Sequence, residues 1–131
     1  LVLRGDTRLS GQDRIYLAPG ARLILYVDAP EFTLTGQGVV NTSKAAQNFL
    51  YFGTPRNRIL KLGGNASFTG AIYAPDADFT LGGGGNNTYD FVGASVTKTV
   101  KMNGHFKFHY DENLRRIGPS RGFIATAWQE F

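Results

Sequence analysis

The sequence predicts an all-β chain folded as a parallel β-solenoid of five or six short coils, closed by a short C-terminal capping helix. The first observation behind this prediction is internal repetition. The phrase Ala-Pro-x-Ala-x-Φ-x-Leu, with Φ apolar, occurs at residues 18–25 and 74–81, and a looser copy occupies 29–36. A second phrase, Phe-x-Gly-Ala, begins at Phe68 and again at Phe91, a separation that suits one solenoid coil. Such repeats cannot bury their apolar faces alone, so we expect them to stack.

The second observation is an alternation of apolar and polar residues with period two, which is typical of short strands. It appears at residues 22–27, 78–81 and 96–102, and 49–52 reads as a buried strand. Residues 123–128 are predicted to form the last strand, and residues 43–48 fit either a loop or a helical turn.

The third observation is the placing of the 17 glycines, which follow the strands as turn residues do. The run Gly82–Gly85 predicts a flexible corner. A β-sandwich also has short strands and glycine turns. The recurrence of whole phrases favours the solenoid over that alternative.

Residues 111–119 are the one helical pattern. Acidic residues lead, basic residues follow, and Gly118-Pro119 ends the segment, which is the charge and capping order of a short helix. Because a solenoid end exposes unpaired strands, we predict that this helix is a cap.

With 131 residues, the chain is predicted to be one domain, residues 1–131. It contains no cysteine and no apolar run long enough for a membrane span. It begins at Leu1 without a methionine, so we expect a fragment of a longer surface protein.

The net charge of +4 is predicted to gather at the C-terminal end of the fold, with the remainder balanced. A polyanion-binding patch is one interpretation of these basic residues. The alternative is that they keep an exposed solenoid end from stacking on a neighbour. The residues are Lys98, Lys101, Lys107, Arg115, Arg116 and Arg121.

Four tyrosines are predicted to point outwards, where they could stack on the rings of a polysaccharide lying along the coils. Burial of most of them would remove the physical basis of this hypothesis. They are Tyr16, Tyr26, Tyr73 and Tyr89.

No catalytic residue, cofactor or metal site is predicted. Asp76 and Asp78 form a close carboxylate pair, but they flank a turn and have no evident partner base or nucleophile. His105, His109 and Asp111 would share one side of an extended strand, and the favoured interpretation is a structural His109–Asp111 hydrogen bond rather than a metal site.

Residues 45–130 resemble a β-helical domain near the C terminus of bacterial envelope proteins, many of which carry a type IV prepilin-like N terminus. The resemblance rests on an ordered set of phrases: Leu-Tyr-Phe-Gly at 50–53, Leu-Gly-Gly-Asn-Ala-Ser-Phe-Thr-Gly at 62–70, Ile-Tyr-Ala-Pro at 72–75, Leu-Gly-Gly at 81–83, Phe-Val-Gly-Ala at 91–94, Met-Asn-Gly-His at 102–105, His-Tyr-Asp-Glu-Asn-Leu at 109–114 and Trp-Gln-Glu at 128–130. It implies a β-helix at the bacterial cell surface, with other surface or pilus subunits as partners.

The sequence therefore predicts a non-enzymatic, extracellular structural or adhesive module of a pilus-like or cell-surface protein. Two alternatives stay open: a polysaccharide-binding β-helix domain, and a minor-pilin domain that binds DNA or another polyanion.

Overall fold

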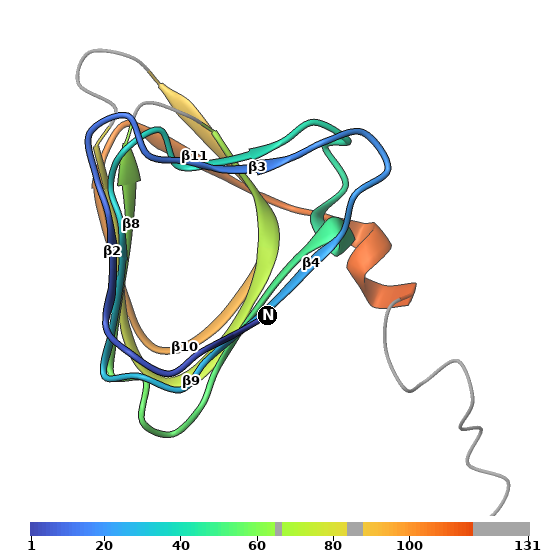
Figure 1. Ribbon diagram of the computed structural model, residues 1–131. Coiled ribbons are helices and arrows are strands. Elements are labelled where there is room, and N and C mark those ends of the chain that lie inside the picture. The colour runs from blue at the N-terminus through green and yellow to red at the C-terminus, as the bar shows by residue number, and fades with distance from the viewer. Residues whose placement is uncertain (65–66, 84–87, 117–131) are drawn as a thin grey trace, which may run out of the picture.

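The chain is a parallel β-solenoid with three faces, seen end-on in Figure 1 as a triangle. The computed structural model describes residues 1–64, 67–83 and 88–116, and only the backbone of Arg116. Every strand pair among these residues is parallel. The predicted all-β class and solenoid are therefore confirmed, and the β-sandwich is excluded.

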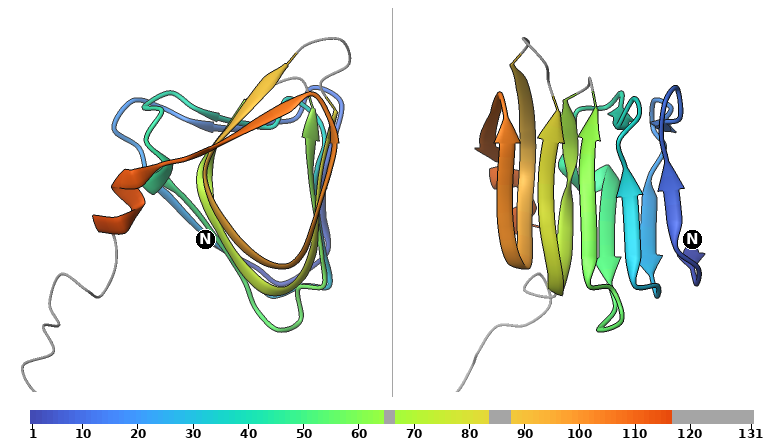
Figure 2. Two further views of the ribbon diagram at one scale, coloured as in Figure 1. Left: turned by 180° about the vertical axis from the view of Figure 1, so that it is seen from behind. Right: turned by 90° about the vertical axis from the view of Figure 1, so that its left-hand side faces the viewer.

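Each face is a stack of strands from successive coils (Figure 2). The first face contains β1 (Val2–Leu3), β4 (Leu23–Val27) and β7 (Phe49–Gly53). The second contains β2 (Thr7–Leu9), β5 (Glu31–Leu34) and β8 (Ile59–Gly64). The third contains β3 (Ile15–Leu17), β6 (Val39–Asn41) and β11 (Phe106–Tyr110). Two long strands bend around the corners and contribute to all three faces, namely β9 (Phe68–Gly83) and β10 (Tyr89–Gly104).

The number of turns in the solenoid can be counted from the strand pairing. On the first face Val2 pairs with Tyr26, Tyr26 with Phe52, Phe52 with Tyr73, and Tyr73 with Val96. The path thus makes about four turns, and the five or six coils predicted from the sequence are not confirmed.

Inward-facing side chains of successive coils form buried columns, because side chains alternate across a strand and the parallel register aligns them. Phe32, Leu60 and Phe79 make one column on the second face, each at most 1% exposed. At the third face, Phe68 stacks on Phe91 with ring centroids 4.6 Å apart. Phe68 and Phe91 are direct register partners, so the repeated Phe-x-Gly-Ala phrase does mark one coil.

One polar cluster is buried inside the first face. The hydroxyl of Tyr51 donates to Oδ1 of Asn57 over 2.8 Å, and Nδ2 of Asn57 donates to the carbonyl oxygen of Ala29. Burial raises the pKa of Tyr51 well above its usual range, so the phenol stays protonated as a donor.

Glycines stack at the corner between the second and third faces. Gly64, Gly83 and Gly104 are register partners with φ between 111° and 114°, a region that favours glycine. A Cβ at Gly83 would lie 2.8 Å from the backbone of Gly64. The corner predicted to be flexible is thus tightly packed at Gly83, while Gly84 and Gly85 lie outside the described residues.

The helical segments are short. Both η1 (Ala46–Asn48) and η2 (Glu112–Arg116) are 3₁₀ helices, and the described part of the chain contains no α-helix. In Figure 1, η2 lies outside a corner of the triangle beside η1. The predicted capping helix is therefore not confirmed. Residues 117–119 and the predicted strand 123–128 lie outside the described residues. No helix within the described ranges is long and apolar enough to cross a membrane.

Candidate functional site

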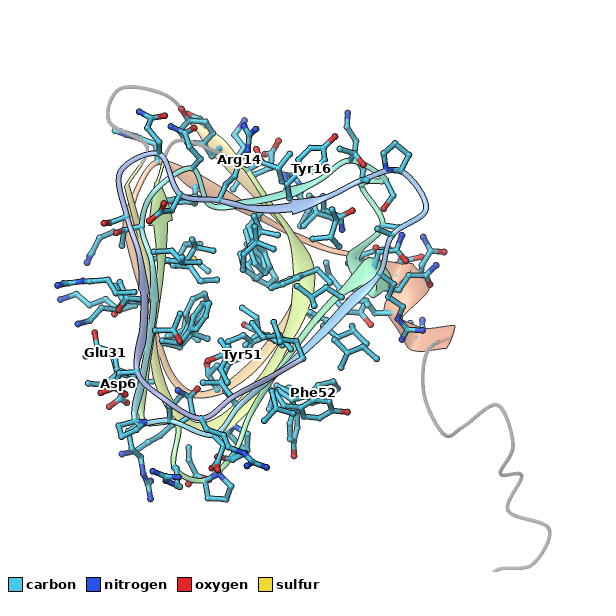
Figure 3. All side chains as sticks on the ribbon, in the orientation of Figure 1. Asp6, Arg14, Tyr16, Glu31, Tyr51 and Phe52 are labelled. Atoms are coloured by element: carbon cyan, nitrogen blue, oxygen red, sulfur yellow. The ribbon has the colours of Figure 1, made fainter. Side chains whose placement is uncertain are left out.

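The outside of the first face carries a continuous row of apolar side chains, which we call the aromatic outer face. Its exposed row runs along the register through Val2, Tyr26, Phe52, Tyr73 and Val96, all exposed except Phe52, which is half-buried between the two tyrosines. These residues alternate along their strands with buried ones, and Figure 3 shows Phe52 outside and its neighbour Tyr51 inside. A parallel row beside it on the same side of the strands consists of Ile24, Leu50, Ala71 and Ala94.

The three aromatic rings of this row contact one another along the solenoid axis. Tyr26 and Phe52 are stacked, with centroids 5.3 Å apart and planes inclined by 18°. Phe52 and Tyr73 follow at 6.4 Å and 54°. Tyr26 is 45% exposed and Tyr73 51% exposed. Rings stacked in this way turn their edges to solvent, because their faces contact each other.

The outside of the second face has the opposite character. Its central row alternates basic residues and threonines, in the order Arg8, Thr33, Lys61, Thr80 and Lys101. Lys61 forms an ion pair with Glu31 over 3.2 Å. Hydrogen bonds from Thr33 and then Lys61, together with the Lys61 charge, lower the pKa of Glu31 below its usual value.

The predicted tyrosines divide between faces. Tyr26 and Tyr73 lie together on the aromatic outer face, whereas Tyr16 lies exposed on the third face with the Arg14 guanidinium 5.7 Å from its ring (Figure 3). Tyr89 shares the inward side of β10 with Phe91 and is half-buried, in ring contact with Phe106 at 6.3 Å. The prediction that Tyr89 points outwards is therefore wrong.

The sequence prediction missed Phe52, the residue that joins the two tyrosines. Phe52 follows Tyr26 by 26 residues and precedes Tyr73 by 21, so no fixed period aligns the three. The sequence also does not show that Phe52 points outwards while Phe49 and Tyr51 point inwards, because all of residues 49–52 are apolar. Residues 49–52 could still have revealed it, because side chains alternate along a strand and Phe52 must therefore point to the side opposite Tyr51.

The predicted basic residues surround one end of the solenoid and do not gather on one face. Lys101 lies on the outside of the second face and Lys107 on the outside of the third, beside Asp90. Lys98 lies at the corner between the first and second faces, and Arg115 lies on η2. The side chain of Arg116 and all of Arg121 lie outside the described residues.

The charges of the rest of the chain balance in number, as predicted, but they are unevenly distributed. Residues 1–22 hold four basic residues against two acidic ones, whereas residues 23–93 hold four against five. Both ends of the solenoid are therefore positive, and its middle is slightly negative.

The histidine and aspartate residues considered for metal binding or catalysis each have a hydrogen-bond or ion-pair partner. Nε2 of His109 lies 3.1 Å from Oδ1 of Asp90, so the predicted His109–Asp111 bond is wrong. Asp111 accepts instead from the backbone N–H groups of Ala46 and Asn113. Each close carboxylate has a partner, since Asp76 pairs with Arg58 and Asp78 accepts from Thr99. Within the ranges that the structure describes, no three His, Asp or Glu side chains are grouped to hold a metal ion.

Residues 1–117 match the profile of a domain family of unknown function, DUF7305, and the chain therefore belongs to that family. No curated protein and no solved structure matches the chain.

Proposed function

We propose that this member of the DUF7305 family is a non-enzymatic structural and adhesive module of a pilus-like or cell-surface protein of the bacterial envelope. In this proposal the solenoid is a stiff support that holds the aromatic outer face towards other surface or pilus subunits. The extracellular location and these partners belong to the same proposal, which also draws on the resemblance described above.

The observation that carries the proposal is the aromatic outer face. The outward side chains of its strands are all apolar, and its exposed row runs through all the stacked strands of the first face. Soluble domains rarely expose contiguous apolar surface of this kind unless it contacts a partner. The polar outside of the second face shows that the fold itself does not require an apolar exterior.

Rigidity supports the structural part of the proposal. The aromatic row stands on strands whose inward residues are buried, such as Leu25, Tyr51 and Ile72. Backbone hydrogen bonds to the coils on both sides fix the strands that carry Tyr26, Phe52 and Tyr73. A surface built in this way loses little conformational entropy on contact.

The finer features predicted from the sequence belong to this proposal as well. After Val96 the path continues through β11, and we propose that a fifth coil is completed and that η2 caps only the corner where β11 ends, leaving the interior of this coil uncovered. The hydrogen bond from the Ala46 N–H to Oδ2 of Asp111, at 3.3 Å, supports this because it ties the start of η2 to the solenoid wall.

Polysaccharide binding is the second candidate, and the exposure of Tyr16, Tyr26 and Tyr73 favours it. The stacking of Tyr26 on Phe52 counts against it, because a sugar ring packs on a free aromatic face and these faces are already in contact. DNA or polyanion binding is a weaker candidate. Its lysines lie on different sides of the solenoid end.

The test compares adsorption of the whole chain to methyl-terminated and hydroxyl-terminated surfaces. We expect strong adsorption to the methyl surface, reduced at least about tenfold in the variant Tyr26→Thr/Phe52→Thr/Tyr73→Thr, which keeps residues that favour strands. The matched control, Arg8→Thr/Lys61→Thr/Lys101→Thr on the second face, should adsorb like the wild type.

Two results would contradict the proposal. One is reproducible turnover of a glycan or peptide that Asp76→Asn or Asp78→Asn abolishes. The other is equal adsorption by both triple variants. Binding to soluble polysaccharide, lost only in the aromatic variant, would favour the second candidate instead.

A further inference from the structure

The C-terminal end of the solenoid exposes the last members of the buried columns. Val100, Met102 and Phe108 are 50%, 43% and 43% exposed. Their register partners in the preceding coil are Phe79, Leu81 and Phe91, none more than 2% exposed. These three apolar side chains therefore point inwards, and no further row of the described residues covers them. We call this surface the open end.

The opposite end of the molecule differs. There the inward residues Leu3, Leu9 and Ile15 are half-buried and pack against the core. The apolar interior is thus more exposed at the open end than at the opposite end of the same stack.

The open end also has free strand edges. Residues 94–104 of β10 pair with β9 on one side, and β11 pairs with β10 on one side. Within the described chain, the other side of these strands has no strand partner. An edge with free N–H and C=O groups over an apolar surface is what an added β-strand requires, with the backbone supplying hydrogen bonds and alternate side chains filling the apolar positions.

The positive charge around the open end indicates that its binding partner is acidic. Lys98, Lys101 and Lys107 surround the open end, and none has an ion-pair partner among the described residues. Residues 94–116 hold five basic residues against two acidic ones. Since residues 1–22 are also positive, a second copy stacked head to tail would bring like charges together. A complementary partner must carry acidic residues around an apolar strand.

We propose that the open end binds an acidic, strand-forming segment of another protein, which adds a further parallel row over Val100, Met102 and Phe108. The open end is separate from the aromatic outer face, so this proposal does not depend on the function proposed above.

The test uses a short synthetic peptide in which Phe and Tyr alternate with Glu, and a matched peptide with Lys in place of Glu. Binding to the whole chain is measured by calorimetry at two salt concentrations. We expect the acidic peptide to bind at least about tenfold more tightly at low salt, and the difference to shrink at high salt. Hydrogen exchange should show new protection of the edge-facing amides of residues 94–110 on binding, since the alternate amides already bond to β9 or β10.

Three variants locate the site. Met102→Asp should weaken binding of the acidic peptide at least about tenfold, because it places a charge in the apolar centre. Lys101→Ala/Lys107→Ala should weaken it and reduce its salt dependence without disturbing the interior, whereas Lys44→Ala, far along the chain from the open end, should bind like the wild type.

Four results would overturn the proposal: no binding of the acidic peptide, equal binding of the two peptides, edge-facing amides of residues 94–110 that are already protected in the free chain, and chains of copies that grow with protein concentration. The third would mean that the chain covers its own open end. The fourth would mean that the occupant is a second copy.

Discussion

The first and second faces have the same interior construction and opposite exteriors. Inside, both present aligned columns of buried apolar residues, such as Leu25, Tyr51 and Ile72 on the first face and Phe32, Leu60 and Phe79 on the second. Outside, the first face carries stacked aromatic rings, and the second alternates basic residues with threonines.

This difference separates what folds the chain from what the chain offers to partners. The columns need apolar residues at the inward positions of the central coils, and both faces provide them, from Leu25 to Ile72 and from Phe32 to Phe79. The outward positions are free of that requirement. The apolar exterior of the first face is therefore a property that folding does not explain, which is why we assign function to it.

The largest effect should come from breaking a column. Phe79→Ala on the second face is expected to cost about 3–5 kcal/mol of unfolding free energy, because it leaves a cavity beside Leu60 and Phe91. Denaturant unfolding measures it. Thr80→Ala, the adjacent outward residue, is the control and should change stability by less than about 1 kcal/mol. Equal losses in the two variants would refute the division between interior and exterior.

A corner should be nearly as sensitive. Gly83→Ala is expected to cost at least about 2 kcal/mol, since its φ of 114° strains any other residue and the new Cβ would approach the Gly64 backbone at 2.8 Å. Gly82→Ala is a close control, because its nearest neighbouring atom would lie 3.8 Å away and its φ is ordinary. Thermal melting of both variants measures the difference. Equal melting temperatures for Gly83→Ala and Gly82→Ala would contradict the expectation that the packing and φ of Gly83 require glycine.

The polar cluster inside the first face should matter somewhat less. Tyr51→Phe removes the hydroxyl that donates to Asn57 and leaves a buried amide oxygen without that partner, at a cost of about 1–2 kcal/mol. Denaturant unfolding of Tyr51→Phe, Asn57→Ala and the double variant gives the coupling between the two groups. Additive losses would show that the hydrogen bond contributes little.

The smallest effect concerns the polar exterior of the second face. Because the folded pKa of Glu31 lies below its ordinary value of 4.5, its contribution is complete above that value and is lost as the pH falls through the lowered pKa. Glu31→Gln should therefore be slightly less stable than the wild type at neutral pH, and the difference should vanish in acid. Melting temperatures across this range measure it. A difference that grew towards acid would contradict the assignment.

The two repeated phrases of the sequence differ in how well they identify equivalent positions in successive coils. Phe68 and Phe91 head identical phrases and are direct register partners. The two better copies of the Ala-Pro phrase, at 18–25 and 74–81, lie at different corners, since Leu23 belongs to the first face and Phe79 to the second. The looser copy is the true equivalent, because Phe32 and Phe79 share one column through Leu60. Coils of unequal length shift the phrases relative to the register.

The amino-acid sequence was enough to predict the fold class, the parallel stacking of strands and the two-residue alternation of buried and exposed positions, but not the corner-crossing lengths of β9 and β10. Those properties follow from the two-residue period of a strand and from the stacking that repeated apolar phrases require. Which outward residues meet could be seen only in the folded chain, because it depends on the length of every intervening turn. The tertiary structure brought Phe52 between Tyr26 and Tyr73, paired His109 with Asp90, distributed the lysines around the open end, and left Val100, Met102 and Phe108 exposed there.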